Sequence, residues 1–511
     1  MRHSRTILFL LLAFTFVMRA GLSLRSDASL ASRLFDDDSF YDQNVSYHLA
    51  HGHGLSIDGR MPTNGIQPLV VALRAPCYAI ASQDKWLGLR LTLILDALID
   101  TLSVYLVYTL VRRLSANASI APIAAAALWA LTYPILAQTM NGLETGLYST
   151  MLLAVMLLYA MRRANFRSGR HERTTQHILF GIALGLLVLA RIDACVFVAC
   201  FIVFEYFDRK PVSHILIPPV VAVLVSSPWW IYNLTIFGSL MPTSGQAESI
   251  GGASLVENLA HAAVALSDVL STFFTMPYPT TPALVLAVGC IIVPASVFWI
   301  ARTLGLGRSI RSNNDIQVLY PLLVGGVCIL IYYILFFHAS YFIPRYIQPL
   351  RIAWLLLVAM SAPTFVRTFA QWSLAARSAF VVLLLSGFSV TVVRYAHIMT
   401  ATGEGDLYRM GLWARKHPAA SVGMQQSGIA SFVSDNVVNL DGKVNADVLL
   451  AMKHGARGRY IDSSGIAYLA DWTTFAEVLV QEAEAAGTPF TLVDSVGLVR
   501  IYRRTDYADP R

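Results

Sequence analysis

The chain alternates between long apolar blocks and short polar connections. Blocks such as Ile7–Val17, Leu91–Val111 and Phe380–Val393 contain few or no charged residues. Stretches of about 20 apolar residues match the hydrocarbon thickness of a bilayer. The pattern therefore predicts an α-helical polytopic membrane domain over residues 1–400. We expect about eleven spans, near residues 6–24, 86–111, 119–138, 146–161, 176–190, 194–207, 213–232, 281–301, 318–337, 346–363 and 379–399.

The connections between the blocks differ in charge, and this difference predicts an orientation. Connections rich in Lys or Arg alternate with connections that are poor in both, and positive charge marks cytoplasmic loops. The N-terminus should then be cytoplasmic, the number of spans odd and the C-terminus extracytoplasmic. The basic connections are Arg112-Arg113, Arg162–Arg173, Arg209-Lys210, Arg302–Arg311 and Arg367–Arg377. The long outer segments are residues 25–85, 233–280 and 401–511.

Residues 401–511 change in character, because short strand-like runs alternate there with amphipathic stretches. Such alternation predicts a small extracytoplasmic α/β domain. The expected helices are Asp406–Lys416, Asn445–His454 and Phe475–Ala486, and the expected strands are Ser421–Gln425, Val437–Asp441 and a final strand over Phe490–Tyr502.

Composition and charge narrow the class of protein. Hydrophobic residues make up 56% of the 511 residues and charged residues 14%, too little charge to cover a soluble surface of this size. The net charge of +7 lies mostly in the short connections, where it sets orientation, so no nucleic-acid partner is expected. The first apolar run continues to Leu24 without a convincing cleavage site, which favours an uncleaved first span over a signal peptide.

The outer segment 25–85 contains three adjacent carboxylates, Asp36, Asp37 and Asp38. Adjacent carboxylates repel one another unless cations or hydrogen-bond donors offset their charge. One interpretation is structural: Asp38 caps a helix that starts at Ser39, and the positive end of the helix dipole stabilises the charges of Asp36 and Asp37. The other is catalytic: one carboxylate is a general base for an acceptor hydroxyl, and another holds a divalent cation or the acceptor. The three residues alone leave both open.

The sequence around the cluster resembles a known class of membrane enzyme. After the acids come a helix, "GHGLSIDG" (residues 52–59 with the preceding His51) and "PTNGIQPL" (62–69). Together they look like bacterial GT-C glycosyltransferases, the class that holds protein mannosyltransferases and lipid-linked arabinofuranosyltransferases. Further matches, in order along the chain, are Asn141–Thr145, Leu189–Asp193, Pro228–Trp230 with Phe237–Thr243, Pro344–Tyr346 and Val438–Asn445.

This resemblance implies an activity and a set of partners. The expected enzyme is a glycosyltransferase, hexosyl or pentosyl and inverting, in the bacterial inner membrane. The sugar would come from a polyprenyl-phosphate carrier, and an envelope glycan, lipid or protein would accept it on the non-cytoplasmic face. Asp37 would be the base, Asp36 or Asp38 would hold a divalent ion (Mg, Mn or Ca), and Arg345 would neutralise the departing phosphate. The chain departs from its relatives after Pro242, where they often carry a lysine and it has Gln246, Ala247 and Glu248.

Five further residues are substrate-binding candidates, each with a structural alternative. A guanidinium at Arg345 can fork onto a phosphate, but Arg345 and Tyr346 could equally anchor a span end at the headgroups. Arg191 and Asp193 could simply pair with each other. Glu144 follows a turn on the outer face and could merely be solvated.

Two other groups of residues suggest different chemistry. His51 and His53 could bind a metal with Asp37, although loop histidines are often incidental. Asp96 and Asp100 are four apart and share one face of a predicted span, and intramembrane acids often mark ion or proton pathways. That pair supports an alternative function as a transporter or flippase of a lipid-linked or small polar solute. Polar contact between packed helices explains it equally well.

Overall fold

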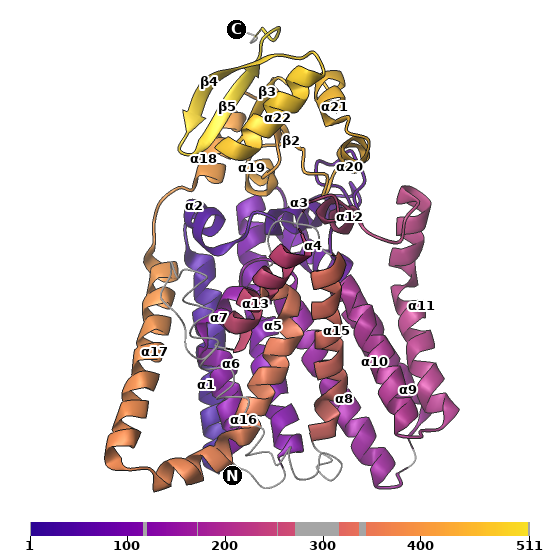
Figure 1. The fold of residues 1–511 in the computed structure, drawn as a ribbon, viewed down its shortest axis with the longest axis vertical. Helices are drawn as coiled ribbons and strands as arrows, with labels where there is room; N and C mark the ends of the chain where they lie inside the picture. Colours follow the sequence, from indigo (N-terminus) through magenta and orange to yellow (C-terminus); the bar gives the residue numbers. More distant parts are fainter. Residues whose placement is uncertain are drawn as a thin grey trace.

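The computed structural model describes residues 2–115, 120–170, 172–252, 254–270, 316–336 and 344–508. Its described part consists of a helical bundle with a small sheet-containing domain at one end, drawn in yellow at the top of Figure 1. The chain starts at the opposite end of the bundle. The predicted span 281–301 and the basic connection 302–311 lie outside the described residues.

Long apolar helices run the length of the bundle, as expected of a multi-pass membrane protein. Seven described helices are long and apolar enough to cross a membrane, or eight if the bent pair α6 and α7 forms one span. The expected count of eleven is not confirmed, because α9 and α10 have only 17 and 13 residues and a span needs about 20. The bundle helices are α1 (Arg2–Ala20), α5 (Lys85–Leu114), α6 (Ile120–Leu131), α7 (Tyr133–Thr139), α8 (Thr145–Arg167), α9 (Thr174–Ala190), α10 (Cys195–Phe207), α11 (Val212–Phe237), α15 (Tyr320–Phe336), α16 (Gln348–Gln371) and α17 (Leu374–Thr400).

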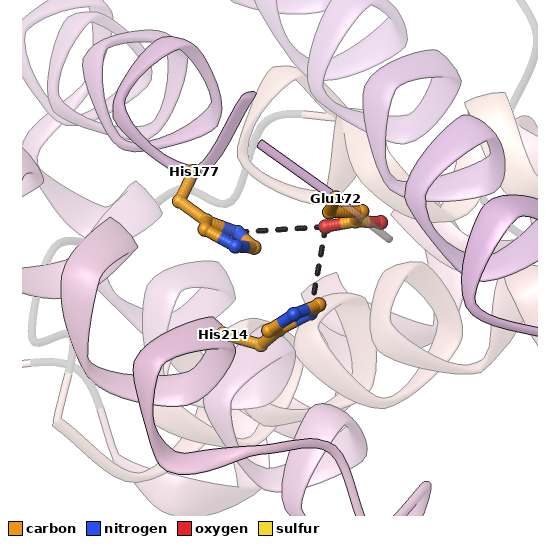
Figure 2. A group of neighbouring side chains, drawn as sticks. All are labelled: Glu172, His177 and His214. Atoms are coloured by element: carbon orange, nitrogen blue, oxygen red, sulfur yellow. Dashed lines mark ion pairs between the residues drawn. The ribbon is translucent and has the colours of Figure 1, made fainter. Parts of the chain in front are cut away.

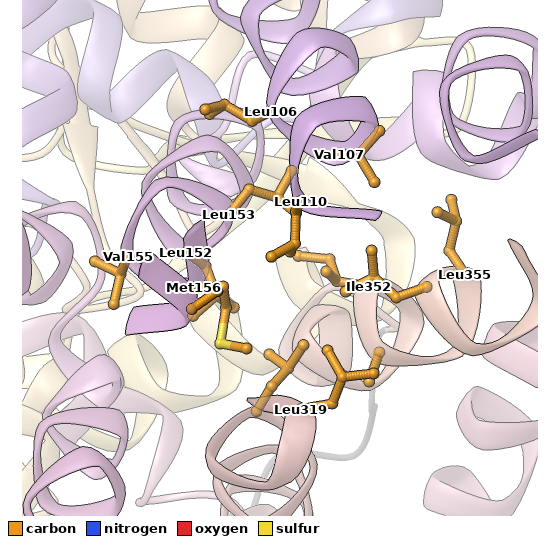
Figure 3. Close-up of a cluster of buried hydrophobic side chains, with 14 of the residues drawn as sticks. Leu106, Val107, Leu110, Leu152, Leu153, Val155, Met156, Leu319, Ile352 and Leu355 are labelled. Carbon is orange, nitrogen blue, oxygen red and sulfur yellow. The ribbon is translucent and has the colours of Figure 1, made fainter. Parts of the chain in front are cut away.

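Apolar side chains from several of these helices form the main core of the bundle. Figure 3 shows Leu110 of α5, Met156 of α8, Leu319 next to α15 and Ile352 of α16 facing one another. All are fully buried. This core fixes the ends of α8, α9 and α16, and these ends carry several of the candidate site residues.

The intramembrane acids of α5 are paired with arginines. Asp100 Oδ2 accepts a hydrogen bond from Arg19 Nε at 2.9 Å, and Asp96 Oδ2 accepts one from Arg74 Nη2 at 2.8 Å. Trp129 Nε1 also donates to Asp100 at 2.9 Å. Buried charges are retained when they are paired and hydrogen-bonded, so these acids tie α1 and α4 (Pro68–Ala81) to α5. The contacts match helix packing rather than an ion pathway.

The domain at the end of the bundle is built on a five-stranded sheet of order β2-β1-β3-β5-β4. Strands β2, β1 and β3 are parallel, whereas β3, β5 and β4 are antiparallel. The expected final strand is two strands, because Gly497 turns the chain with φ of +62°. The elements are α18 (Asp406–Lys416), β1 (Val422–Met424), α19 (Gly428–Val433), β2 (Val437–Asn439), α20 (Ala446–Lys453), α21 (Arg457–Ser463), β3 (Tyr468–Trp472), α22 (Thr473–Ala485), β4 (Phe490–Val496) and β5 (Val499–Arg504).

The sheet domain packs tightly on the outer segments of the bundle. Phe40 of α3 (Ser39–Ala50) meets Phe432 of α19 edge to face, with ring centroids 5.1 Å apart, inside an apolar core that both parts share. Gly428 lies so close to Asp37 that an added Cβ would be 2.0 Å from the Asp37 carbonyl oxygen. The domain is therefore held in one position over the start of α3.

The Arg19–Asp100 pair gives a stability prediction. Replacing Asp100 with Asn leaves the Arg19 charge buried without a counter-charge, which should lower the free energy of unfolding by about 3 kcal/mol or more. Thermal unfolding of the purified protein in detergent measures the loss. The double variant Arg19→Met/Asp100→Asn removes both charges and should recover part of the stability. Equal unfolding temperatures for Asp100→Asn and the parent would show that this pair does not hold α1 to α5.

Candidate active site

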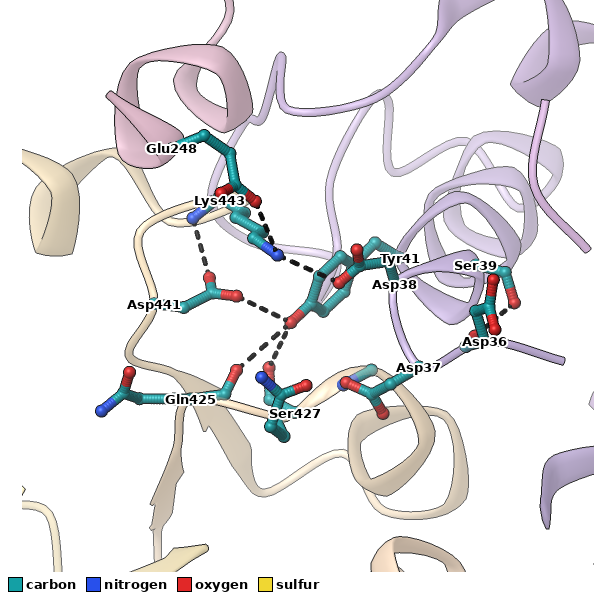
Figure 4. A network of polar contacts seen from close by, with 12 residues as sticks. Asp36, Asp37, Asp38, Ser39, Tyr41, Glu248, Gln425, Ser427, Asp441 and Lys443 are labelled. Atoms are coloured by element: carbon teal, nitrogen blue, oxygen red, sulfur yellow. Dashed lines mark hydrogen bonds and ion pairs between the residues drawn. The ribbon is translucent and has the colours of Figure 1, made fainter. Parts of the chain in front are cut away.

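The three adjacent acids lie immediately before α3, and their side chains point in three directions (Figure 4). Asp38 occupies the N-cap position of α3, but its carboxylate makes no capping hydrogen bond. The helix-capping explanation of the cluster therefore does not account for Asp38. Each of the three carboxylates instead contacts a different part of the molecule.

The Asp38 carboxylate is held between two cations. Its Oδ2 lies 3.2 Å from Arg345 Nη2, and its Oδ1 lies 3.2 Å from Lys443 Nζ. Although partial burial opposes ionisation, these two cations lower the pKa of Asp38 to about 2. Asp38 is thus ionised at neutral pH and links Arg345, in the short turn just before α16, to Lys443 of the sheet domain.

The Asp37 carboxylate points toward the sheet domain and accepts two backbone hydrogen bonds. They come from Gly428 N at 3.0 Å and Ile429 N at 2.7 Å, at the start of α19. Burial raises the pKa of Asp37 to about 7, against the opposing effect of these two amides. An ionised carboxylate has about four acceptor sites, so the amides orient Asp37 without using all of its lone pairs.

The Asp36 side chain is the most accessible of the three, with 56% of its surface exposed. Its Oδ2 accepts a hydrogen bond from Asn141 Nδ2 at 2.9 Å, and Arg345 Nη1 lies 3.9 Å away. Asn141 belongs to the Asn141–Thr145 segment that the sequence singled out. The structure thus brings this segment to the acid cluster.

All three outer segments converge on Lys443. Lys443 Nζ lies 3.0 Å from Glu248 Oε1 of α12 (Thr243–Glu248), and Thr243 Oγ1 donates to the Lys443 carbonyl oxygen at 2.7 Å. Gly65 is close enough that an added Cβ would lie 1.8 Å from that same oxygen. Relatives often carry a lysine shortly after the proline of this motif, and this chain does not, but Lys443 of the sheet domain lies against the same segment.

A cavity of about 210 Å³ opens beside Asp38 and collects most of the predicted binding residues. Asp38, Glu144, Arg191, Arg345 and Tyr346 all line it, as does Lys443. Its apolar wall includes Tyr332, Tyr333 and Phe336 at the end of α15. A second hollow is lined by Asp36, Asp37 and Asp38 together with Tyr133, Gln138 and Trp472. Asp38, Arg345 and Lys443 border both.

Asp42 is a cavity residue that the sequence reasoning missed. It follows Asp38 by one helical turn on α3, is 5% exposed and lines the cavity. Burial, assisted by the negative charge of Glu144, raises the pKa of Asp42 to about 8. The spacing of four between Asp38 and Asp42 places them on one helix face and was the available signal.

Arg191 anchors a network of buried polar groups at the far wall of the cavity. Its guanidinium donates to both oxygens of Asp193 at 3.0 Å, to Glu144 Oε1 at 2.7 Å and to Tyr333 Oη at 3.0 Å. The alternative in which Arg191 and Asp193 pair with each other therefore matches the geometry. Asp193 does not line the cavity in the described structure.

Tyr346 links this network to Arg345. Its ring stacks on that of Tyr333 with centroids 4.6 Å apart and an interplanar angle of 12°. The guanidinium carbons of Arg191 and Arg345 lie 5.7 Å and 5.4 Å from the Tyr346 ring centroid. Stacked rings and cation–π contacts fix the two arginines relative to each other, so the cationic wall of the cavity is preorganised.

The structure does not bring together the histidine site considered from sequence. His51 Nδ1 lies 2.7 Å from the Tyr47 carbonyl oxygen, whereas Asp37 binds the start of α19. Among the described residues, the metal-compatible group of His, Cys, Asp or Glu side chains is Glu172, His177 and His214, away from the acid cluster. A cation at Asp36 and Asp38 stays a prediction.

No family model and no curated protein matches this sequence. Solved structures match its fold. The archaeal oligosaccharyltransferase AglB from Archaeoglobus fulgidus, in complex with an inhibitory peptide and a dolichol-phosphate, aligns with a TM-score of 0.57 and 11% identity over 99% of this chain and 75% of its own. An A. fulgidus oligosaccharyltransferase complex with Zn and sulfate aligns with a TM-score of 0.55 and 12% identity, over 91% of this chain and 67% of its own.

ArnT from Cupriavidus metallidurans, bound to undecaprenyl phosphate, aligns with a TM-score of 0.56 and 13% identity. The alignment covers 99% of each chain, so it includes both the membrane bundle and the sheet domain. The chain therefore has the GT-C fold that the sequence resemblance led us to expect.

Proposed function

We propose that this protein is an inverting glycosyltransferase that takes a sugar from a polyprenyl-phosphate carrier on the non-cytoplasmic side of a bacterial inner membrane. The observation that carries the proposal is the Asp38 carboxylate clasped by Arg345 and Lys443 beside a cavity at one end of the bundle. Two structures with the same fold contain dolichol-phosphate and undecaprenyl phosphate. A site built from two converging cations suits such a phosphate.

Arg345 and Lys443 are the residues we assign to the carrier phosphate. In the structure both cations contact Asp38. In this proposal the carrier phosphate binds close to that carboxylate and competes with it for the two cations. When the carrier enters, its phosphate takes over hydrogen bonds from both cations, and they stabilise the charge that grows on it as the glycosidic bond breaks. Both oxygens of Asp38 contact these cations, so Arg345 and Lys443 together balance the charge of the carboxylate until the phosphate arrives.

Asp37 is the base in this proposal. The acceptor hydroxyl attacks the anomeric carbon while the bond between that carbon and the phosphate oxygen breaks with inversion. The electron pair leaves with the polyprenyl phosphate, and the hydroxyl proton passes to Asp37. A pKa of about 7 suits a base that works near neutral pH. The second hollow, which Asp36 and Asp37 line, is the place for the acceptor.

The location of the site determines the kind of donor and acceptor. With the sheet domain outside, nucleotide sugars are poor donors because their pool is cytoplasmic. The acceptor is then an envelope glycan, a lipid or a protein, and the transferred sugar is a hexose or a pentose. Glu144, Arg191 and Tyr346 shape the cavity around the sugar and carrier.

The base assignment is tested by matched Asn substitutions. Asp37→Asn should lower transfer by about 10²–10⁴-fold, the usual contribution of a general base, whereas Asp36→Asn should lower it less. The assay uses membranes that carry each variant and a labelled polyprenyl-phosphate sugar, with protein amounts quantified in parallel.

Asp471 provides the control, because it also accepts two backbone amide bonds, from Gln425 at 2.8 Å and Gln426 at 2.9 Å. Asp471→Asn removes a comparable anchor in the sheet domain, and the Asp471 side chain itself lines neither hollow. It should destabilise the protein about as much as Asp37→Asn and keep most of the activity. Equal activity losses in the two variants would mean that Asp37 is only a structural anchor.

The pKa of Asp37 also predicts the pH dependence of transfer. A base must be deprotonated to act, so kcat/KM should rise with pH and level off above about 7. Below that pKa the rate should fall about tenfold per pH unit. The profile is measured on the parent and on Asp471→Asn, whose inflection should lie slightly lower because the charge of Asp471 helps to raise the pKa of Asp37. A flat profile between pH 5 and about 8 would exclude Asp37 as the titrating base.

The role of Lys443 is tested against a neighbouring lysine of the same domain. Lys443→Met removes a charge-assisted contact to phosphate, worth about 1.5–3 kcal/mol, and should lower kcat/KM by about 10–100-fold. Lys453→Met removes a lysine that contacts Gln246 of α12 but does not line the cavity, and should be nearly silent. If both variants behave alike, Lys443 does not bind the carrier.

A further inference from the structure

A second cluster of chemically capable side chains lies at the other end of the bundle from the acid cluster. Glu172 in the connection between α8 and α9, His177 of α9 and His214 of α11 face one another there (Figure 2). All three are buried, with 3%, 3% and 6% of their surface exposed. They belong to no part of the proposed transfer site.

The spacing of their atoms is that of a metal coordination shell. Glu172 Oε2 lies 3.4 Å from His177 Nδ1 and 3.5 Å from His214 Nδ1. One ligand atom from each of the three residues lies within 4.8 Å of the other two. Tetrahedral zinc with bonds of 2.0–2.2 Å places neighbouring ligand atoms about 3.3–3.6 Å apart. Both distances from Glu172 Oε2 to the imidazole nitrogens fall in that range.

The Glu172 carboxylate is unsatisfied by the described protein. Its side chain is fully buried, yet neither oxygen accepts a hydrogen bond from a described residue. A buried carboxylate that is ion-paired but accepts no aligned hydrogen bond is incompletely compensated for its burial. Its ion-pair contacts are with Arg162 Nη1 at 3.1 Å and with the two imidazoles. The oxygens therefore point at a place that suits a cation.

In the structure the positive charge of Arg162 balances the negative charge of Glu172. Arg162 Nη1 lies 2.7 Å from His177 Nδ1, and because a guanidinium can only donate, the His177 nitrogen must present its lone pair. Its Nη2 contacts both oxygens of Glu205, at 3.1 Å and 3.3 Å. Arg162 thus has a second carboxylate to which it can turn completely, and Lys210 Nζ shares that carboxylate at 2.9 Å.

We propose that Glu172, His177 and His214 form a binding site for a transition-metal ion, with zinc the best match. Two imidazole nitrogens and one carboxylate oxygen suit zinc and its transition-metal neighbours, whereas Mg²⁺ and Ca²⁺ prefer all-oxygen shells. The nearby charges of Arg162 and Lys210 also disfavour ions that are held by charge alone. The metal would hold the segment between α8 and α9, which carries Glu172, against helices α9 and α11. The guanidinium of Arg162 competes with the metal for Glu172 and His177.

The test measures metal bound to the full-length protein purified in detergent. After dialysis against a low level of Zn²⁺, the parent should retain about one zinc per chain, and His177→Gln and His214→Gln should lose it. His454→Gln, a variant of an exposed histidine in the sheet domain, should keep the metal. Co²⁺ added to metal-free protein should give the visible absorption of a tetrahedral site in the parent and in His454→Gln, but not in His177→Gln or His214→Gln.

Arg162→Gln separates a metal site from a purely structural charge network. Removal of a competing positive charge within a few ångströms should raise the Zn²⁺ affinity about tenfold or more. A charge network without metal predicts lower thermal stability in this variant and no metal. Folding of each variant is checked by size-exclusion chromatography, and a ligand variant that does not fold is replaced by Glu172→Gln.

Three results would overturn the inference. The first is the absence of zinc from both the parent and Arg162→Gln. The second is an equal zinc content in His177→Gln and the parent. The third is zinc that is lost in Asp38→Asn but kept in His177→Gln, which would place the metal at the acid cluster. None of these outcomes depends on transfer activity.

Discussion

The Asp38 carboxylate links the membrane bundle to the sheet domain at the centre of the candidate site. Asp38 starts α3 on the membrane side and holds Arg345 from the end of a membrane helix and Lys443 from the sheet domain. Two cations placed this close repel each other, and they stay together because an anion lies between them. The constraint is one of charge: Arg345 and Lys443 need anionic partners, which are Asp38 for both and also Glu248 for Lys443.

Much of the remaining architecture holds these charges in place. The shared core around Phe40 and Phe432 keeps the sheet domain over α3, and the Asp37 contacts to Gly428 and Ile429 fix its orientation. On the opposite wall, Arg191 is saturated by Glu144, Asp193 and Tyr333. The sheet domain is therefore part of the site, because it supplies Lys443 and the amides that orient Asp37.

The sequence predicts much of this arrangement where the signal is local. The acid cluster, Asn141, Arg191 and Arg345 lie in segments whose patterns stand out along the chain, and all lie around two adjoining hollows. The apolar pattern likewise predicts the membrane bundle, and the alternation after residue 400 indicates strands and helices in that segment.

The sequence could not show contacts between residues that are far apart along the chain, and it could not fix the lengths of short helices and strands. Lys443 is about 400 positions from Asp38, and no spacing rule relates them. Asp42 was hidden inside an ordinary helical pattern, and its altered pKa arises only from burial beside Glu144. The expected count of eleven spans is not confirmed at short helices such as α10, because apolarity alone does not say whether a helix crosses the bilayer. Gly497 split an expected strand in two, since a single glycine is a weak turn signal.

The central claim is that a lipid-linked sugar is consumed outside the cytoplasm, and one comparison tests it most directly. Lipid-linked and envelope glycans are extracted from a deletion strain and from its parent, and their sugars are identified by mass spectrometry. The account predicts that a polyprenyl-phosphate sugar accumulates in the deletion strain and that the same sugar is missing from one envelope glycan, lipid or protein. Identical carrier pools and identical envelope glycans in the two strains would contradict it.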